Sequence, residues 1–466
     1  MNHKIERRKY IAVTMKLISP LAVSSGESLY SDADVQRNGT GDIFVPGTSL
    51  AGAFRNILED YGCAGSVMGY SEGSRGRMSP LYISDLYFEN QKKEEITVSV
   101  RDRVKLNGGK TVDNKFETEI VEPEIIGTLF LNYVQRRKNQ VKDEPVDYDG
   151  AVSTILKEIQ SGAIRIGANK NRGFGRFQVL EVYEKEFKEE NVEEWISFVP
   201  QSKDCSAYGE GVSYEDWVAN PDREKTNMEL DDKSGYLKIK VPLRLTGGIS
   251  IRRYSTKPEM PDFEHITCGK DEKGKPIPVI PGSSWSGAIR SEALSILTEL
   301  VGKKKAACLI RGWFGHVKEK EERKAGEWDA WQSTVVIGES RLKGGTWKTM
   351  TRNQINRFDA STKTGALYSE QTYFGGDTVL ELMVRKNEQD DYKALAGLLL
   401  LVVHELQNGY VSVGGQTAIG RGLFEKRGEL TIDTGEVEQE DPEIGYNKSL
   451  YRFLYEGGAG KWIGKS

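Results

Sequence analysis

Two glycine-rich runs contain residue types whose spacing could bring the backbone close to a ligand. The first run, residues 166–177, reads IGANKNRGFGRF, and the second, residues 413–424, reads VGGQTAIGRGLF. Glycine adopts positive φ readily, and without a side chain it lets a ligand approach the backbone closely. Basic residues lie among these glycines. The two runs therefore indicate a basic surface that occurs twice in the chain.

A second segment is also repeated, upstream of each run. Residues 45–55 read VPGTSLAGAFR, and residues 280–290 read IPGSSWSGAIR. Two signatures that recur in the same order at similar spacing indicate a duplicated domain, and such repeats decide the architecture before any single motif does.

Length and composition agree with two soluble domains. The chain has 466 residues, which exceeds one ordinary core. No apolar run approaches the roughly 18 residues of a membrane span, and the start lacks the apolar core of a signal peptide. Four cysteines without a CxxC pair indicate a reduced, cytoplasmic setting. His265 and Cys268 form an isolated HxxC that lacks two further zinc ligands.

The net charge of −4 argues mildly against a nucleic-acid partner. A local basic stripe matters more than the total. Acidic residues gather in 185–194, 215–232 and 436–443, away from the glycine-rich runs. The charge is therefore segregated, and a basic groove is compatible with the sequence.

Hydrophobic patterns predict the same order of elements in both halves. Thr48 or Ser49 would cap a helix over 49–60, and the corresponding helix of the second half covers 283–300. The first half also has strands at 10–19, 79–88, 96–100, 125–134, 163–166 and 176–183, and a helix at 149–160. The second half has strands at 236–245, 333–341 and 378–385, a helix at 391–406, and strands around the glycine loop within 411–424.

These orders predict an α+β protein of two tandem ferredoxin-like or RRM-like (β-α-β-β-α-β) domains. We place the first domain at 1–186 and the second at 234–428. Residues 187–233 are an acidic linker, and 429–466 form a C-terminal tail whose aromatic residues indicate docking.

Each half also carries a long excursion, at about 100–127 and 349–376, before the third strand. Both excursions are polar and basic, with an apolar residue after the tip, Phe116 or Leu367. This pattern favours a β-hairpin that stands out from its domain. One such hairpin would be an ordinary solvated loop, but its recurrence at matching positions favours a function.

These motifs together resemble the CRISPR-associated RAMP superfamily. They comprise the PG(T/S)S helix start, the segments RDRVKLN (101–107) and NQINRFD (353–359) that lead into the hairpins, and the terminal glycine loop. More closely, the chain resembles the backbone subunit of type III effector complexes. Two units in one chain resemble the fused tandem subunits of subtype III-D. The resemblance covers about 10–183 and 236–425.

The resemblance implies a subunit that lines guide RNA, with each hairpin acting as a thumb that wedges into the guide–target duplex. Base pairing of the guide, not the protein, would then read sequence. Free N–H groups of the glycine loops and helix starts favour phosphates. For any single arginine, a surface salt bridge is the alternative. The implied RNA contacts are Ser49, Arg55, Arg101, Arg103, Lys170, Arg172, Arg176, Ser283, Arg290, Arg352, Arg357 and Arg421.

The resemblance also implies catalytic aspartates in the loop after each first strand. Residues 31–38, SDADVQRN, resemble the family's D-x-P-V-x-R-D. This resemblance implies Asp32 as the catalytic residue, with Asp34 as the second choice. The second loop departs further and offers Asp262. Such a carboxylate could hold a divalent metal, Mg²⁺ or Mn²⁺, near a phosphate or accept the proton of the attacking 2′-hydroxyl.

The expected function is therefore a type III backbone subunit that binds guide CRISPR RNA and cleaves complementary single-stranded target RNA as a metal-dependent endoribonuclease. Its partners would be these RNAs and the other effector subunits, with no membrane. Two alternatives stay open: a scaffold with the same binding but no cleavage, and a guide-processing endoribonuclease, which usually works through histidine.

Overall fold

The computed structural model describes residues 5–24, 33–89, 96–106, 112–136, 140–141, 144–200, 205–220, 235–254, 259–271, 273–317, 330–386, 391–434 and 442–456. The chain forms two compact units. Unit 1 contains residues 1–170 and 174–235, and unit 2 contains 171–173 and 236–466. No helix in the described part of the chain is long and apolar enough to cross a membrane.

Unit 1 is built on an antiparallel sheet whose central strand is β1 (Ile5–Leu17). On one side β1 pairs with β12 (Phe177–Lys188), and on the other with β9 (Ile126–Arg136). The sheet order is β13-β12-β1-β9-β6-β2, and β5 also pairs with β9. The short strands are β2 (Phe44–Val45), β5 (Leu81–Ile83), β6 (Leu86–Phe88) and β13 (Val212–Ser213).

Helices α1 (Gly47–Asp60) and α3 (Tyr148–Ser161) contribute to the main core of unit 1. On α1, Leu50, Phe54 and Leu58 are fully buried at helical spacing, as the sequence pattern predicted. Smaller elements are α2 (Ala64–Met68), β3 (Tyr70–Glu72), β4 (Arg75–Arg77), β10 (Gln140–Val141), β11 (Glu144–Pro145), η2 (Lys170–Arg172), η3 (Glu189–Asn191), α4 (Val192–Ser197), η4 (Cys205–Tyr208) and α5 (Tyr214–Val218).

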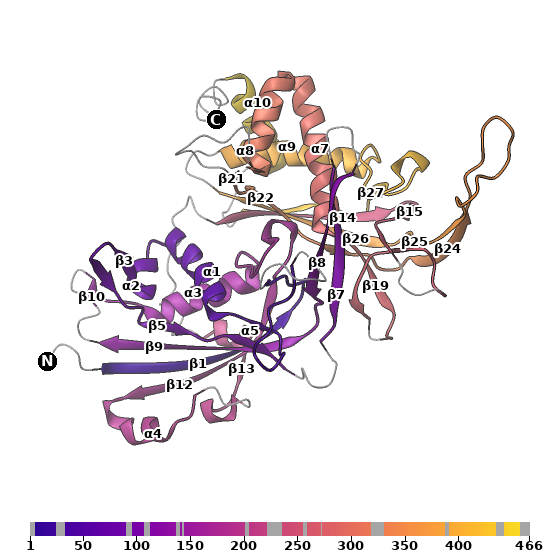
Figure 1. Ribbon diagram of the computed structural model, residues 1–466. Coiled ribbons are helices and arrows are strands. Elements are labelled where there is room, and N and C mark those ends of the chain that lie inside the picture. Colours follow the sequence, from indigo (N-terminus) through magenta and orange to yellow (C-terminus); the bar gives the residue numbers. More distant parts are fainter. Residues whose placement is uncertain are drawn as a thin grey trace. The chain divides into compact units, whose positions relative to one another are not determined.

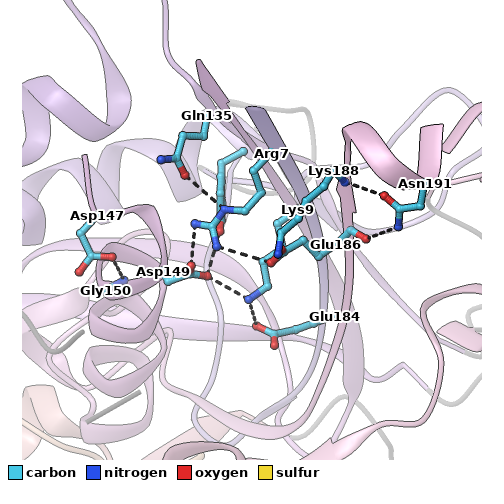
Figure 2. Close-up of polar contacts among 11 residues, drawn as sticks. Arg7, Lys9, Gln135, Asp147, Asp149, Gly150, Glu184, Glu186, Lys188 and Asn191 are labelled. Carbon is cyan, nitrogen blue, oxygen red and sulfur yellow. Dashed lines mark hydrogen bonds and ion pairs between the residues drawn. The ribbon is translucent and has the colours of Figure 1, made fainter. Parts of the chain in front are cut away.

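A charged network ties α3 to the sheet of unit 1 (Figure 2). The Asp149 carboxylate of α3 accepts from Lys9 Nζ at 2.9 Å and lies 2.7 Å from Arg7 Nη2, both on β1. Lys9 also pairs with Glu184 of β12 at 3.2 Å. Burial alone would raise the pKa of Asp149, but Lys9 and Arg7 outweigh it and lower that pKa. These partners compensate the desolvation of the carboxylate, so the network fixes the helix against β1.

Unit 2 repeats this plan. Its central strand β14 (Tyr236–Leu245) lies between β26 (Asp377–Arg385) and the last strands, β27 (Phe424–Lys426) and β28 (Thr431–Asp433). The sheet order is β22-β26-β14-β27, with β22 at Val335–Ile337. In both units, therefore, the first strand lies between the strand that follows the glycine loop and the strand that follows the hairpin.

The core of unit 2 is made by its sheet and by α7 (Gly282–Val301), α8 (Lys303–Phe314), α9 (Asp391–Gln407) and α10 (Pro442–Tyr455). Helix α9 is buried almost all round, which explains its continuous apolar sequence. Outside the hairpin sheet described below, the smaller elements are β18 (Thr267–Lys270), β19 (Pro276–Ile280), β20 (His316–Val317), β21 (Ala330–Trp331), β23 (Ser340–Arg341) and η6 (Thr417–Ile419).

The α+β prediction is confirmed, and several details are corrected. Helices α1 and α7 begin at Gly47 and Gly282, directly after Pro46 and Pro281, so the cap predicted at Thr48 or Ser49 is wrong. The residues just before each glycine loop are irregular rather than the predicted strands. Helices α8 and α10 were not predicted. The described part of 187–233, which we predicted as an acidic linker, packs onto unit 1 through α4, η4 and α5.

Candidate nucleic-acid interface

Each unit carries a hairpin at the position of the predicted excursion. In unit 1, β7 (Val98–Leu106) pairs with β8 (Val112–Val121). In unit 2, β24 (Thr346–Arg352) pairs with β25 (Tyr368–Phe374). The loop 353–367 between β24 and β25 projects away from the rest of unit 2 (Figure 1).

The projecting loop of unit 2 presents apolar side chains to solvent. Phe358 is 100% exposed, and Ile355 and Leu367 are also largely exposed. Local hydrogen bonds define the tip: the Asn356 side chain accepts from Phe358 N at 3.1 Å, and Asp359 accepts from Ser361 N at 3.0 Å. These bonds fix the backbone of the loop, and its three exposed apolar side chains make it a candidate contact surface.

Strand β25 belongs to a second sheet of unit 2, which forms the base of the hairpin. It pairs with β15 (Gly248–Ile249) and, in parallel, with β17 (Phe263–His265), which in turn pairs with β16 (Arg252–Tyr254). Side chains alternate between the two faces along each strand, and paired residues of neighbouring strands point to the same face. One face of this sheet therefore collects side chains from four strands.

That face is organised around one buried carboxylate, Glu370, which is only 1% exposed. Its oxygens lie 2.7 Å from nitrogens of Arg252, Arg352 and Arg421. The three arginines come from β16, β24 and the second glycine loop. We call these four residues the Glu370 network. Gln416, also of the glycine loop, donates to Glu370 at 3.0 Å and contacts Arg421.

The Glu370 network carries more positive than negative charge. Burial alone would raise the pKa of Glu370, but the hydrogen bond and charge of Arg421, with those of Arg252, lower it, so the carboxylate is ionised at neutral pH. Three guanidinium groups around one carboxylate leave a surplus of two positive charges. Arg252 and Arg352 are partly exposed, with about a third of each side chain accessible. These two arginines are therefore the members of the network that solvent reaches.

Glycines make the loop beside this network possible. In both loops the last glycine, Gly175 or Gly422, has φ +72°, and the preceding chain packs directly against it. A Cβ added to Gly175 would lie 1.8 Å from the Ile166 carbonyl oxygen, and one added to Gly422 would lie 1.9 Å from that of Val413. The two copies thus share one backbone geometry at matching positions, and only glycine fits it.

The hairpin of unit 1 is tied to its own glycine loop in a related way. Arg101 of β7 is buried, with its guanidinium carbon 5.6 Å from the centre of the Phe174 ring. Ile120 of β8 packs with the same phenylalanine. In both units, therefore, the glycine loop and the hairpin base hold each other in place.

The loop after the first strand also reaches the hairpin in each unit. Ala33 forms a parallel bridge with Thr118 of β8, and Val35 N donates to the Glu119 carboxylate at 3.1 Å. In unit 2, Phe263 pairs in parallel with Glu370 of β25. The candidate aspartates Asp32 and Asp262 each immediately precede the bridging residue. The two loops thus occupy similar places, although their sequences differ.

Of the candidate aspartates, Asp262 and Asp34 are described and Asp32 lies outside the described residues. Asp262 is exposed, and its Oδ2 accepts from Ser369 N at 2.7 Å and Ser369 Oγ at 3.0 Å. These bonds lower the pKa of Asp262, so it is ionised at neutral pH. Part of this carboxylate is thus used to fasten β17 to the hairpin. Asp34 is half-buried beside the first hairpin.

Several predicted RNA contacts have structural roles. Arg55 donates to the Met68 and Gly69 carbonyls at the end of α2, and Arg290 donates to Gly315 O. Arg421 is buried in the Glu370 network, and Arg101 is buried against Phe174. Arg101 and Arg421 are buried, whereas Arg55 and Arg290 are half-buried. All four make structural contacts, and their role in RNA binding stays a prediction.

The start of α1 already has an anionic partner. Gly47 N at the start of α1 donates to the Asp85 carboxylate at 2.7 Å. A phosphate near Ser49 would therefore meet a negative charge, and the RNA contact at Ser49 stays a prediction. Ser283, at the start of α7, is exposed.

The remaining predicted contacts are surface residues or lie outside the described side chains. Arg357 is exposed at the tip of the second hairpin, and Arg352 is partly exposed at its base. Lys170 and Arg172 lie in η2 of the first glycine loop, and Arg176 follows that loop half-buried. The side chains of Arg103 and Phe116 lie outside the described residues.

Sequence reasoning missed Phe358, Arg252 and Glu370. The first is visible in hindsight as one of two apolar residues, with Ile355, within the polar tip NQINRFD. The other two carried no signal, because their partners lie more than a hundred residues away or on another strand.

The part of the chain that the structure describes offers few ligands for a bound metal. The described residues contain no group of three or more histidine, cysteine, aspartate or glutamate side chains that could hold an ion. Magnesium is commonly held by one or two carboxylates together with substrate phosphates. Asp262 could supply one such carboxylate, and a metal there would polarise a phosphate of bound RNA.

Comparison with known families agrees with this organisation. The model of the RAMP superfamily matches residues 14–178 and 262–425, which is more than half of the chain. The chain therefore belongs to the RAMP superfamily, a group of CRISPR-associated proteins, and the family model matches it twice in tandem. A comparison with curated proteins found no match.

Proposed function

We propose that the chain is a tandem backbone subunit of a type III CRISPR effector, closest to the fused subunits of subtype III-D, and that it binds guide RNA. The observation that carries this proposal is the Glu370 network. It places a surplus of positive charge at the base of a hairpin, next to a glycine loop. Phosphate contacts of this kind supply most of the affinity of proteins for nucleic acids.

The strand order supports the proposal in both units. With the hairpin set aside, each unit has the sheet order of a ferredoxin-like or RRM-like β-α-β-β-α-β module. Proteins with two such modules can bind one RNA strand in series. We therefore expect each unit to hold a stretch of the guide, with the target strand recruited by base pairing.

The hairpin of unit 2 has the properties of a wedge. Insertion of an apolar side chain between base steps costs a few kcal/mol of stacking, which nearby phosphate contacts must offset. Phe358 is presented at the apex, and the basic residues Arg357 and Lys348 lie on the same hairpin. We propose Phe358 as the wedging side chain, with Ile355 and Leu367 beside it.

RNA binding is tested by titration of the full chain with single-stranded RNA. Lys348→Glu combined with Arg357→Glu should weaken binding about tenfold at moderate salt. It should also make the slope of log affinity against log salt shallower by about 1.4, since each lost phosphate contact removes about 0.7. The matched control is Lys240→Glu, an exposed lysine on β14 of the main sheet. Equal effects of the double variant and the control would contradict the proposal.

Cleavage of target RNA is a second candidate function, favoured by the position of the aspartate loops beside both hairpins. Asp262 is exposed and ionised. A carboxylate in this state can accept the proton of a 2′-hydroxyl that attacks the adjacent phosphate. The geometry for such an attack must come from the RNA, whose displaced nucleotide would have to be held in line.

The cleavage proposal predicts that Asp32→Ala and Asp262→Ala each remove one cut site. In the assembled complex, the rate of cleavage at the affected site should fall about 100-fold or more. This is the lower end of the range that general-base catalysis contributes. RNA affinity of the isolated chain should not change. Cleavage that persists at full rate in the double variant would favour the non-catalytic scaffold. Specific cutting of repeat RNA by the isolated chain would instead support a guide-processing enzyme.

A further inference from the structure

A cluster of aromatic rings lies on the hairpin sheet of unit 2. Tyr254 ends β16, Phe263 begins β17 and Tyr368 begins β25. The Tyr254 and Phe263 ring centres are 5.1 Å apart, and those of Phe263 and Tyr368 are 5.6 Å apart with the planes nearly perpendicular. The three rings come from three neighbouring strands at their shared end.

Arg252 fixes this cluster to the Glu370 network. Its guanidinium carbon lies 4.7 Å from the centre of the Phe263 ring and 5.5 Å from that of Tyr368. The same guanidinium donates to Glu370 at 2.7 Å. The arginine is thus held on two sides, by the rings and by the buried carboxylate. A ring cluster held in this way is preorganised and needs little rearrangement to bind a ligand.

Exposure differs sharply within the cluster. Tyr254 is 63% exposed, whereas Phe263 and Tyr368 are half-buried. The two inner rings therefore support the outer one, which remains largely accessible to solvent. An exposed ring beside surplus positive charge has the composition of a site for single-stranded nucleic acid, in which bases stack on aromatic side chains and phosphates face cations.

We propose that Tyr254 is a stacking platform for one unpaired nucleobase of single-stranded RNA, and that the adjoining phosphates face Arg252 and Arg352. The proposal rests on the RNA-binding function proposed above and names where a base, rather than only a phosphate, is held. Because every base has an aromatic face, the platform would accept any of the four. It lies at the hairpin base and is distinct from the Phe358 tip.

The accessible Tyr254 ring, together with the neighbouring positive charge, favours RNA over a protein segment as the occupant. An acidic peptide would be attracted by the same arginines, but it would not require an accessible ring. The two occupants therefore differ in their dependence on Tyr254. An oligomer of ribose phosphate without bases distinguishes stacking from charge contacts. It keeps the phosphate charges of RNA but has no base that could stack on Tyr254.

The experiment measures the affinity of the full chain for two labelled probes of equal length, oligouridylate and an abasic ribose-phosphate oligomer. Tyr254→Ala should weaken oligouridylate binding about tenfold, since it removes the ring on which one base would stack. It should leave the abasic probe unaffected. Tyr254→Phe keeps the ring and should bind both probes as the unaltered chain does.

Tyr451→Ala is the matched control, because Tyr451 is 59% exposed on α10 and also pairs with a second tyrosine ring. It should change neither affinity. Equal loss for both probes, or no loss for oligouridylate, would overturn the platform while leaving RNA binding by the unaltered chain intact. If the unaltered chain binds neither probe, the proposed function itself fails, and the platform fails with it.

Discussion

Replacement of Gly422 by alanine should destabilise unit 2 by about 3 kcal/mol or more. The residue has φ +72°, and left-handed backbone costs a non-glycine residue about 1–2 kcal/mol. The added Cβ would also meet the Val413 carbonyl oxygen at 1.9 Å, so the loop would have to open. Opening would break the hydrogen bond from Val413 N to Gly422 O, which is 2.9 Å long.

Gly175→Ala should have the same effect on unit 1, because the geometry there is the same. The matched control is Gly420→Ala: its φ is +77°, but an added Cβ would have no atom within 4 Å. The control should therefore lose only the free energy that left-handed backbone costs an alanine, about 1–2 kcal/mol. Urea denaturation followed by circular dichroism measures all three variants. A Gly422→Ala variant no less stable than Gly420→Ala would contradict the close packing of the loop.

Glu370→Gln should lower the free energy of unfolding by about 3 kcal/mol, because removal of one partner leaves a buried charge uncompensated. Most of this loss would come from Arg421, because its guanidinium group is buried, with 4% of the residue exposed, and would lose its carboxylate partner. Glu425→Gln, an exposed carboxylate on β27, is the control and should change stability by less than about 0.5 kcal/mol. A double variant with Arg421→Gln should lose less than the sum of the two single losses.

The same variant predicts a pH dependence. The pKa of Glu370 is lower in the folded chain than its ordinary value of 4.5. Its stabilising contribution is therefore fully present above pH 4.5 and is lost as the pH falls through the lowered pKa. The stability difference between the unaltered chain and Glu370→Gln should shrink below pH 4.5. A stability difference between the two proteins that stays constant from pH 7 to well below pH 4.5 would contradict an ionised Glu370 in the folded chain.

Repeats and periodic patterns were enough to predict the organisation of the fold. The duplicated PG(T/S)S segments and glycine runs indicated two units, and the long strands and helices followed from local patterns. Local patterns failed where tertiary contacts decide. Helix α1 begins at Gly47 because Asp85, far along the chain, binds its first amide. Helix α10 was missed because its helical spacing lies within a polar tail.

The candidate site was predictable only in part. The hairpins and the glycine loops were visible as repeated segments. The Glu370 network was not, because it joins residues 252, 352, 370 and 421, which no sequence pattern connects. The network also explains the structural role of Arg421, which we predicted as an RNA contact from its basic character. Its guanidinium group forms an ion pair with Glu370, a buried carboxylate on β25.

The central claim, that the chain binds an RNA strand, is tested most directly by the salt dependence of its affinity for single-stranded RNA. If four cations of the hairpin sheet and tip, Arg252, Lys348, Arg352 and Arg357, contact phosphates, the slope of log affinity against log salt should be about −3. Binding that is absent at low salt, or a slope near zero, would contradict the account.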